Sequence, residues 1–211
     1  MRSDAVLQQL EQDWRGAVAS LPGRNLAHPD WLRTMPPPLP SRPAALFAEL
    51  EDTRRHWLEL REWQGLREHA ESMVNAGWSY KDLLAHLASW AVEFHRQIVT
   101  AAEGREFDYE IPFQPKVGPT DWNAIEVARR REMSLDEIFD QFDAAFAASQ
   151  ELVLALPPAQ LTATVRFPIR MGPEPLVGNI PRIVAMKCWH NHYHFAQIRQ
   201  RLGALLERER E

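Results

Sequence analysis

The stretch CWHNHYHFAQIRQ, residues 188–200, places three histidines at alternating positions. Successive residues of an α-helix are rotated by about 100°, so His190 and His194 lie about 40° apart while His192 lies about 200° from His190. Two imidazoles four residues apart on one helix face can bind the same metal ion. The spacing therefore predicts a metal-ligating pair, His190 and His194, with His192 directed to the surface or to a neighbouring helix.

A metal site needs further ligands, and His86 is the best candidate in the rest of the chain. In an expected helix that begins at Ser79, His86 lies at one edge of the apolar stripe, and Glu93 follows about two turns later on nearly the same line. A lone buried histidine is more often a hydrogen-bonded core residue, so the metal interpretation depends on all three histidines together. Three neutral imidazoles leave coordination positions open, as in catalytic metal sites, and Glu93 is then our candidate for catalytic proton transfer.

Four long amphipathic helices are expected to position these side chains. Their expected spans are residues 44–70, 79–102, 134–156 and 182–206, and two of them begin with capping boxes, SYKD at 79 and SLDE at 134. Prolines and glycines predict an irregular crossover at 107–123 and a loop at 157–181, where only TATVRFPI has strand character. We expect an all-α fold, an antiparallel four-helix bundle with a long crossover after the second helix.

The first 40 residues are expected to be a separate N-terminal helical extension with a proline-rich linker, RTMPPPLPSRP at 33–43. The bundle domain then covers residues 41–211. Apolar residues of the extension recur at spacings of three and four, so it is expected to pack on the bundle or on a second subunit. A homodimer is therefore a candidate assembly.

Composition argues against several classes of partner. The chain of 211 residues has a net charge of −5, and its basic residues are scattered among acidic ones, which argues against nucleic acid and against an anionic membrane surface. A single cysteine, Cys188, cannot form an internal disulfide and is expected to be a packed core residue. The amino terminus lacks the apolar core of a signal peptide, so we expect a cytoplasmic location.

Two segments resemble the DinB-like (DinB/YfiT-like) superfamily of metal-binding four-helix bundles. GWSYKDLLAHLASW, residues 77–90, resembles the second-helix signature of that superfamily, and HNHYHFAQIRQRL, residues 190–202, is similar to its fourth-helix signature. Between them, TDWNAIEVARRREMSLDEIFDQFDAAFAA looks like the segment leading into the third helix in the ClbS and DfsB group. The resemblance covers about residues 44–206, and the first 40 residues have no counterpart in it.

This resemblance implies a divalent ion, most commonly zinc or nickel, bound at the positions of His86, His190 and His194. It also implies a metal-dependent hydrolase or a low-molecular-weight-thiol transferase that acts on a small electrophilic molecule. The alternative is a ClbS/DfsB-like stress-protection protein that binds or sequesters a small ligand without turnover. In each case the expected partner is a small molecule, with a low-molecular-weight thiol as a second candidate.

Overall fold

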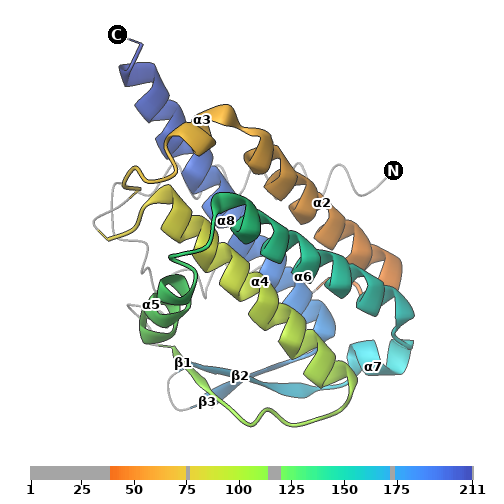
Figure 1. The fold of residues 1–211 in the computed structure, drawn as a ribbon. Coiled ribbons are helices and arrows are strands. Elements are labelled where there is room, and N and C mark those ends of the chain that lie inside the picture. Colours follow the sequence, from red (N-terminus) through yellow and green to blue (C-terminus); the bar gives the residue numbers. More distant parts are fainter. Residues whose placement is uncertain (1–38, 75–76, 114–119, 172–173, 211) are drawn as a thin grey trace.

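The structure is a computed structural model that describes residues 39–74, 77–113, 120–171 and 174–210. The predicted N-terminal extension and most of the linker lie outside these ranges. Four long helices form a bundle (Figure 1), and they are α2 (Pro43–Glu62), α4 (Tyr80–Ala102), α6 (Leu135–Ala155) and α8 (Ile180–Arg208). Helices α2 and α4 each pack against both α6 and α8. Helices α2 and α4 therefore lie diagonally opposite each other in the bundle. The predicted four-helix bundle is confirmed.

The direction of each helix follows from its cross-helix contacts. Helices α2 and α6 are antiparallel, because Arg54 pairs with Asp143 at 2.6 Å and the later Arg61 pairs with the earlier Asp140 at 2.6 Å. Figure 1 shows α4 and α6 running in the same direction, and α2 and α8 in the opposite one. The long connection from Glu103 to Ser134 returns the chain to the end where α4 begins, so the predicted crossover after the second long helix is present.

Serine caps define where two of these helices start. Ser79 Oγ accepts a hydrogen bond from the Asp82 backbone N–H at 3.1 Å, and Asp82 Oδ2 accepts one from the Ser79 N–H at 3.0 Å. Ser134 and Glu137 make the same reciprocal pair at 3.2 Å and 2.6 Å. Each pair satisfies two backbone N–H groups that a helix start would leave without partners. Both capping boxes predicted from the sequence are confirmed.

The helix predicted over residues 44–70 is interrupted. Helix α2 ends at Glu62, Trp63 is extended with φ −76° and ψ 104°, and the short helix α3 (Gln64–Glu68) follows. Gly65 lies against the end of α8, where an added Cβ would meet Leu206 Cδ1 at 2.8 Å. Close packing of the backbone on α8 thus accompanies the break, and the single long helix is a wrong prediction.

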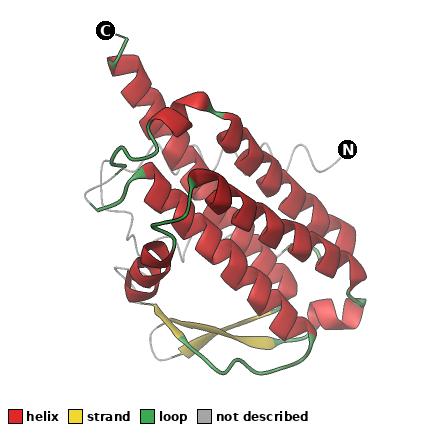
Figure 2. Ribbon diagram, in the orientation of Figure 1, coloured by secondary structure: helices red, strands yellow, loops and turns green. Residues whose placement is uncertain are grey.

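Both proline-rich connections contain short elements, and of these the sequence indicated only the strand in TATVRFPI. The first includes β1 (Ile111–Phe113) and α5 (Thr120–Arg129), and the second includes α7 (Pro158–Thr162), β2 (Val165–Met171) and β3 (Glu174–Gly178). The strands form one sheet in the order β1-β2-β3, with β1 parallel and β3 antiparallel to β2. Figure 2 shows this sheet at one end of the bundle. The strand character of TATVRFPI is confirmed by β2, and the sheet is an addition to the predicted helical fold.

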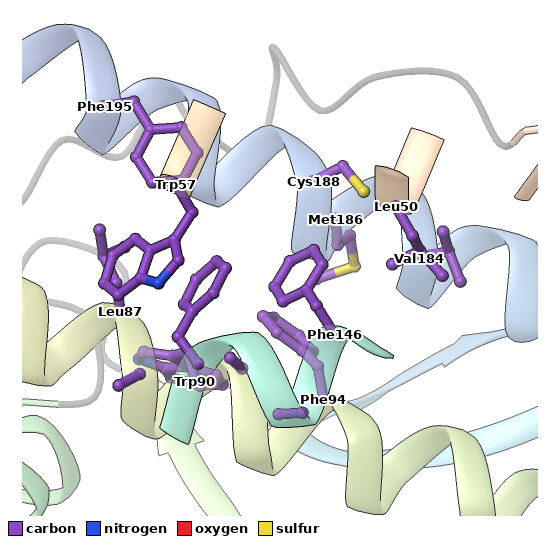
Figure 3. Packing of buried hydrophobic residues seen from close by; sticks show 14 of the residues in the cluster. Leu50, Trp57, Leu87, Trp90, Phe94, Phe146, Val184, Met186, Cys188 and Phe195 are labelled. Carbon is purple, nitrogen blue, oxygen red and sulfur yellow. The ribbon is translucent and has the colours of Figure 1, made fainter. Parts of the chain in front are cut away.

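Stacked aromatic rings fill the interior of the bundle. Trp57 of α2 stacks on Phe142 of α6 with 3.9 Å between ring centroids, and Phe142 stacks on Phe146 at 4.3 Å. Figure 3 shows Trp57, Phe146 and Cys188 among the packed residues of the core. Burial raises the pKa of the Cys188 thiol to about 12, so Cys188 is a packed residue, as predicted. None of the helices in the described ranges is long and apolar enough to cross a membrane.

Candidate functional site: a histidine cluster between α4 and α8

The structure brings together the three histidines that the sequence singles out. His86 lies in the second turn of α4, and His190 and His194 lie one turn apart on the face of α8 that packs against α4. The Nε2 atoms of His86 and His190 are 3.2 Å apart. Ring centroids of the three imidazoles are separated by 4.8 to 5.2 Å. We call His86, His190 and His194 the histidine cluster.

The donor atoms of the histidine cluster fit a divalent metal ion. Each imidazole offers one ring nitrogen, and these nitrogens all lie within 4.8 Å of one another. A tetrahedral ion with metal–nitrogen bonds of about 2.0 to 2.1 Å keeps its ligand atoms about 3.3 to 3.4 Å apart. The 3.2 Å between His86 Nε2 and His190 Nε2 is close to that spacing, and a side-chain rotation of His194 can supply the rest.

Hydrogen bonding leaves ring nitrogens of the cluster without protein partners. His194 donates from Nδ1 to Gln197 Oε1 at 3.0 Å, which leaves its Nε2 unprotonated in the neutral ring. The Nδ1 atoms of His86 and His190 are buried and have no hydrogen-bond partner in the described part of the chain. Such atoms are rare in folded proteins. The Nε2 atoms of His86 and His190 face each other, and only one of them can donate a hydrogen to the other. A cation between them would bind both nitrogens.

Burial keeps these imidazoles neutral. It lowers the pKa of His86 and of His190 well below 6.5, and repulsion from the neighbouring imidazoles lowers both further. The Asn123 side chain acts in the opposite direction on the pKa of His86, although it lies outside hydrogen-bond geometry to Nδ1. Burial lowers the pKa of His194 to about 4. The neutral ring is the form that binds metal, so the cluster is in its ligating form at pH 7.

Aromatic side chains enclose the cluster on the α4 side. The Trp78 ring centroid lies 5.0 Å from that of His86, and the Trp90 centroid lies 6.0 Å from that of His190. Helix α5 continues this wall, because Trp122 packs on Trp90 at 4.4 Å. Aromatic residues at helical spacing usually pack in a core, and here they also border the imidazoles. Their position limits water around the imidazoles and strengthens electrostatic interactions at the cluster.

Glu93, the residue predicted to transfer a proton, lies outside the histidine cluster. Its buried carboxylate accepts hydrogen bonds from the Tyr109 hydroxyl at 2.6 Å, from Gln97 Nε2 at 2.7 Å and from Arg96 Nη2 at 2.6 Å. The Arg96 guanidinium also lies 3.8 Å from the Tyr109 ring centroid. These contacts hold the segment after α4 against the helix, and no sequence pattern pointed to Tyr109. The catalytic role of Glu93 stays a prediction.

A comparison with known protein families identifies the family to which the chain belongs. Residues 60–193, more than half of the sequence, match the family described as "Mycothiol maleylpyruvate isomerase N-terminal domain". The chain belongs to this family. Because the family is part of the DinB/YfiT-like superfamily, the resemblance seen in the two sequence motifs is confirmed. The narrower resemblance to the ClbS and DfsB group stays a prediction.

A solved structure supports the same fold. YfiT from Bacillus subtilis, described as "a probable metal-dependent hydrolase with an unusual four-helix bundle topology", matches with a TM-score of 0.58 and 14% sequence identity. The match covers 78% of this chain and 87% of that chain. At this identity the likeness shows a shared fold. No curated protein matches the sequence.

Proposed function

We propose that the protein is a metal-dependent enzyme in which His86, His190 and His194 hold a divalent ion, and that it acts on a small electrophilic molecule with a low-molecular-weight thiol. One observation carries the proposal. The cluster holds two imidazoles with facing Nε2 atoms 3.2 Å apart, and a third imidazole lies within reach of the same point. Zinc and nickel are the ions we expect, because imidazole nitrogen suits both.

The chemistry expected at this site combines the ion with the enclosure around it. A divalent ion with three imidazole ligands lowers the pKa of a water or thiol at an open position and so supplies a nucleophile near neutral pH. The protein contributes ligand orientation, since the hydrogen bond from His194 Nδ1 to Gln197 fixes which nitrogen of His194 is free. Trp78 and Trp90 keep water away from the imidazoles on the α4 side.

Thiol-dependent chemistry is favoured over hydrolysis by family membership. The family to which the chain belongs is named for a mycothiol maleylpyruvate isomerase, and the name joins a thiol with a small organic acid. Hydrolysis is the second candidate, because YfiT, which shares the fold, is described as a probable metal-dependent hydrolase. A protein that sequesters a ligand without turnover is the third outcome that an experiment must separate.

Metal analysis followed by turnover assays tests this proposal. The purified protein is treated with a chelator, reloaded with zinc or nickel, and assayed on maleylpyruvate and on a simple alkylating electrophile, with mycothiol, with glutathione and without thiol. We expect turnover that requires both the ion and a thiol. Turnover without thiol would support the hydrolase instead, and ion binding without any turnover would support sequestration.

Variants of the cluster complete the test. His86→Ala and His194→Ala should each remove bound metal and activity, whereas His69→Ala should remove neither, because His69 lies outside the cluster and pairs with Glu209 at 3.2 Å. Glu93→Gln separates a catalytic role from a positioning role. A catalytic carboxylate predicts loss of turnover with unchanged metal content, while a positioning role predicts lower thermal stability together with a raised KM. Wild-type protein that binds neither zinc nor nickel would overturn the proposal.

A further inference from the structure

A second group of metal-ligand side chains lies between α2 and α8. It consists of Asp52 and His56, four residues apart on α2, and His192 on α8. Because His192 is rotated by about 200° from both His190 and His194, it lies on another side of α8 from the histidine cluster. The contacts agree, since His192 touches Thr53 of α2 while His190 touches His86 of α4. We call Asp52, His56 and His192 the α2–α8 triad.

One oxygen and two nitrogens of the α2–α8 triad converge. Asp52 Oδ2 lies 3.7 Å from His56 Nε2 and 3.7 Å from His192 Nε2. The imidazole rings of the two histidines meet edge to face with 5.3 Å between centroids. Tetrahedral metal–ligand bonds of about 2.0 to 2.2 Å place ligand atoms about 3.3 to 3.6 Å apart. The three ligand atoms all lie within 4.8 Å of one another, so side-chain rotations would close the triad around one ion.

A second layer of side chains orients His56 for ligation. The Nδ1 atom of His56 lies 3.1 Å from Glu59 Oε2, and Arg199 holds the same carboxylate oxygen at 2.6 Å. His56 Nδ1 also lies 3.3 Å from Arg199 Nη2, which can only donate, but the contact to the Glu59 carboxylate is shorter. A carboxylate only accepts, so this contact favours the tautomer that donates from Nδ1 and presents the lone pair of Nε2 toward Asp52. A carboxylate that orients a histidine in this way is the usual outer partner of a metal-ligating imidazole. Asp52 is also available, because its ion pair with Arg55 uses Oδ1 and leaves Oδ2 free for a ligand.

One contact competes with metal binding at this place. His192 Nε2 lies 3.2 Å from Thr53 Oγ1, and the Thr53 hydroxyl already donates to the Glu49 carbonyl oxygen at 2.9 Å. In the metal-free protein His192 therefore donates from Nε2 to Thr53, and ligation requires that proton to move to Nδ1. In the histidine cluster the corresponding proton lies between the facing Nε2 atoms of His86 and His190, so binding an ion there breaks no bond to a threonine, and we expect the α2–α8 triad to be the weaker site.

We propose that the α2–α8 triad is a second divalent-metal site, selective for ions such as zinc, cobalt(II) or nickel. Two imidazoles and one carboxylate suit these ions, whereas calcium and magnesium prefer oxygen ligands alone. The side chains of Asp52, His56 and His192 are 27%, 24% and 32% exposed, so an ion can enter from solvent and retain water ligands. The proposal does not depend on the function of the histidine cluster.

Titration of the metal-free full-length protein with Co²⁺ and with Zn²⁺ tests this site. We expect two equivalents to bind, the second more weakly. Asp52→Asn should remove the weaker event or weaken it by about tenfold or more, and Glu59→Gln should weaken it by roughly 10- to 100-fold. Asp140→Asn is the matched control, because Asp140 of α6 pairs with Arg61 of α2 at 2.6 Å and lies outside the triad.

A double variant separates the two sites. His86→Ala combined with His194→Ala should bind one equivalent with the affinity of the weaker wild-type event, and adding Asp52→Asn should abolish that binding. Far-UV circular dichroism confirms that each variant is folded. If the wild-type protein bound only one equivalent of metal, and Asp52→Asn left that binding unchanged, the proposed second site would be wrong while the site at the histidine cluster would stand. If the double variant loses only the stronger binding event and keeps the weaker one, the result supports both sites.

Discussion

Replacing Lys187 by methionine should stabilise the protein at neutral pH. Lys187 is fully buried between α6 and α8, donates from Nζ to Ser149 Oγ at 2.9 Å, and has its ammonium 3.9 Å from the Phe146 ring centroid. No carboxylate in the described ranges forms an ion pair with it. Burial therefore lowers the pKa of Lys187 from 10.5 to about 7. Methionine retains the length and packing of the side chain and removes the amine.

The size of the effect follows from the titration of Lys187. Between pH 7 and pH 10.5 the unfolded chain binds a proton that the folded protein does not, so the free energy of unfolding rises with pH over this window. One unit of pKa corresponds to about 1.4 kcal/mol, so the titration of Lys187 should raise the free energy of unfolding by about 2 kcal/mol between pH 7 and pH 9. The unfolded Cys188 thiol, with an ordinary pKa of 9.0, ionises mainly above pH 8, while the folded thiol has a pKa of about 12. Its ionisation lowers the free energy of unfolding as the pH rises, opposite to the effect of Lys187. The window for the experiment therefore ends at pH 9.

Urea unfolding at pH 7, 8 and 9, in chelator and followed by far-UV circular dichroism, measures this effect. The stability advantage of Lys187→Met over wild type should be largest at pH 7 and smaller by about 2 kcal/mol at pH 9. Lys81→Met is the control, because Lys81 lies near the surface, 3.5 Å from Glu71 Oε1, and its difference from wild type should be constant. An equal difference at pH 7 and pH 9 for Lys187→Met would refute the reasoning.

The histidine cluster should make the metal-free protein sensitive to acid, because below pH 6.5 the unfolded chain binds protons that the folded imidazoles exclude. For His194, whose folded pKa is about 4, the free energy of unfolding should fall by about 3 kcal/mol between neutral pH and pH 4. Urea unfolding at stepped pH measures this fall, and a free energy of unfolding that stayed unchanged down to pH 5 would contradict it. Ser134→Ala breaks the capping box of α6 and should lower the free energy of unfolding by about 1 kcal/mol, with Ser134→Thr retaining most of it. Trp57→Phe removes the hydrogen bond from Nε1 to the Phe139 carbonyl at 3.1 Å and should lower the same quantity by about 1 to 3 kcal/mol; a loss under about 0.5 kcal/mol would show that the carbonyl finds another donor.

Local signals made the long helices predictable. A serine followed three residues later by an acidic residue has a defined physical effect at a helix start, and both Ser79 and Ser134 act in that way. The break at Trp63 had no such signal. It accompanies the packing of Gly65 against Leu206 near the end of α8, and a contact between residues so far apart in the chain leaves no mark on the local apolar spacing.

The sheet was hidden for a related reason. Strand β1 has three residues and pairs Ile111 with Ile169, so neither its length nor its sequence shows the alternation that identifies a longer strand. The Lys187 environment was hidden by residue type, because a lysine within a helix is expected to reach solvent. The histidine cluster was accessible because its i, i+4 pair on α8 is a local pattern. The partner His86 was indicated by its position beside an apolar stripe and by the resemblance of residues 77–90 to the second-helix signature.

The alternation of histidines on α8 follows from the helices that flank it. Both α2 and α4 pack against α8, and residues two apart on a helix are rotated by about 200° relative to each other. His190 and His194 therefore reach α4 and meet His86, while His192 reaches α2 and meets Asp52 and Thr53. A sequence shows the alternation but not which helices lie on the two sides. The alternation thus belongs to a helix that presents histidines to two different neighbouring helices, and substitutions at His192 should leave the histidine cluster intact.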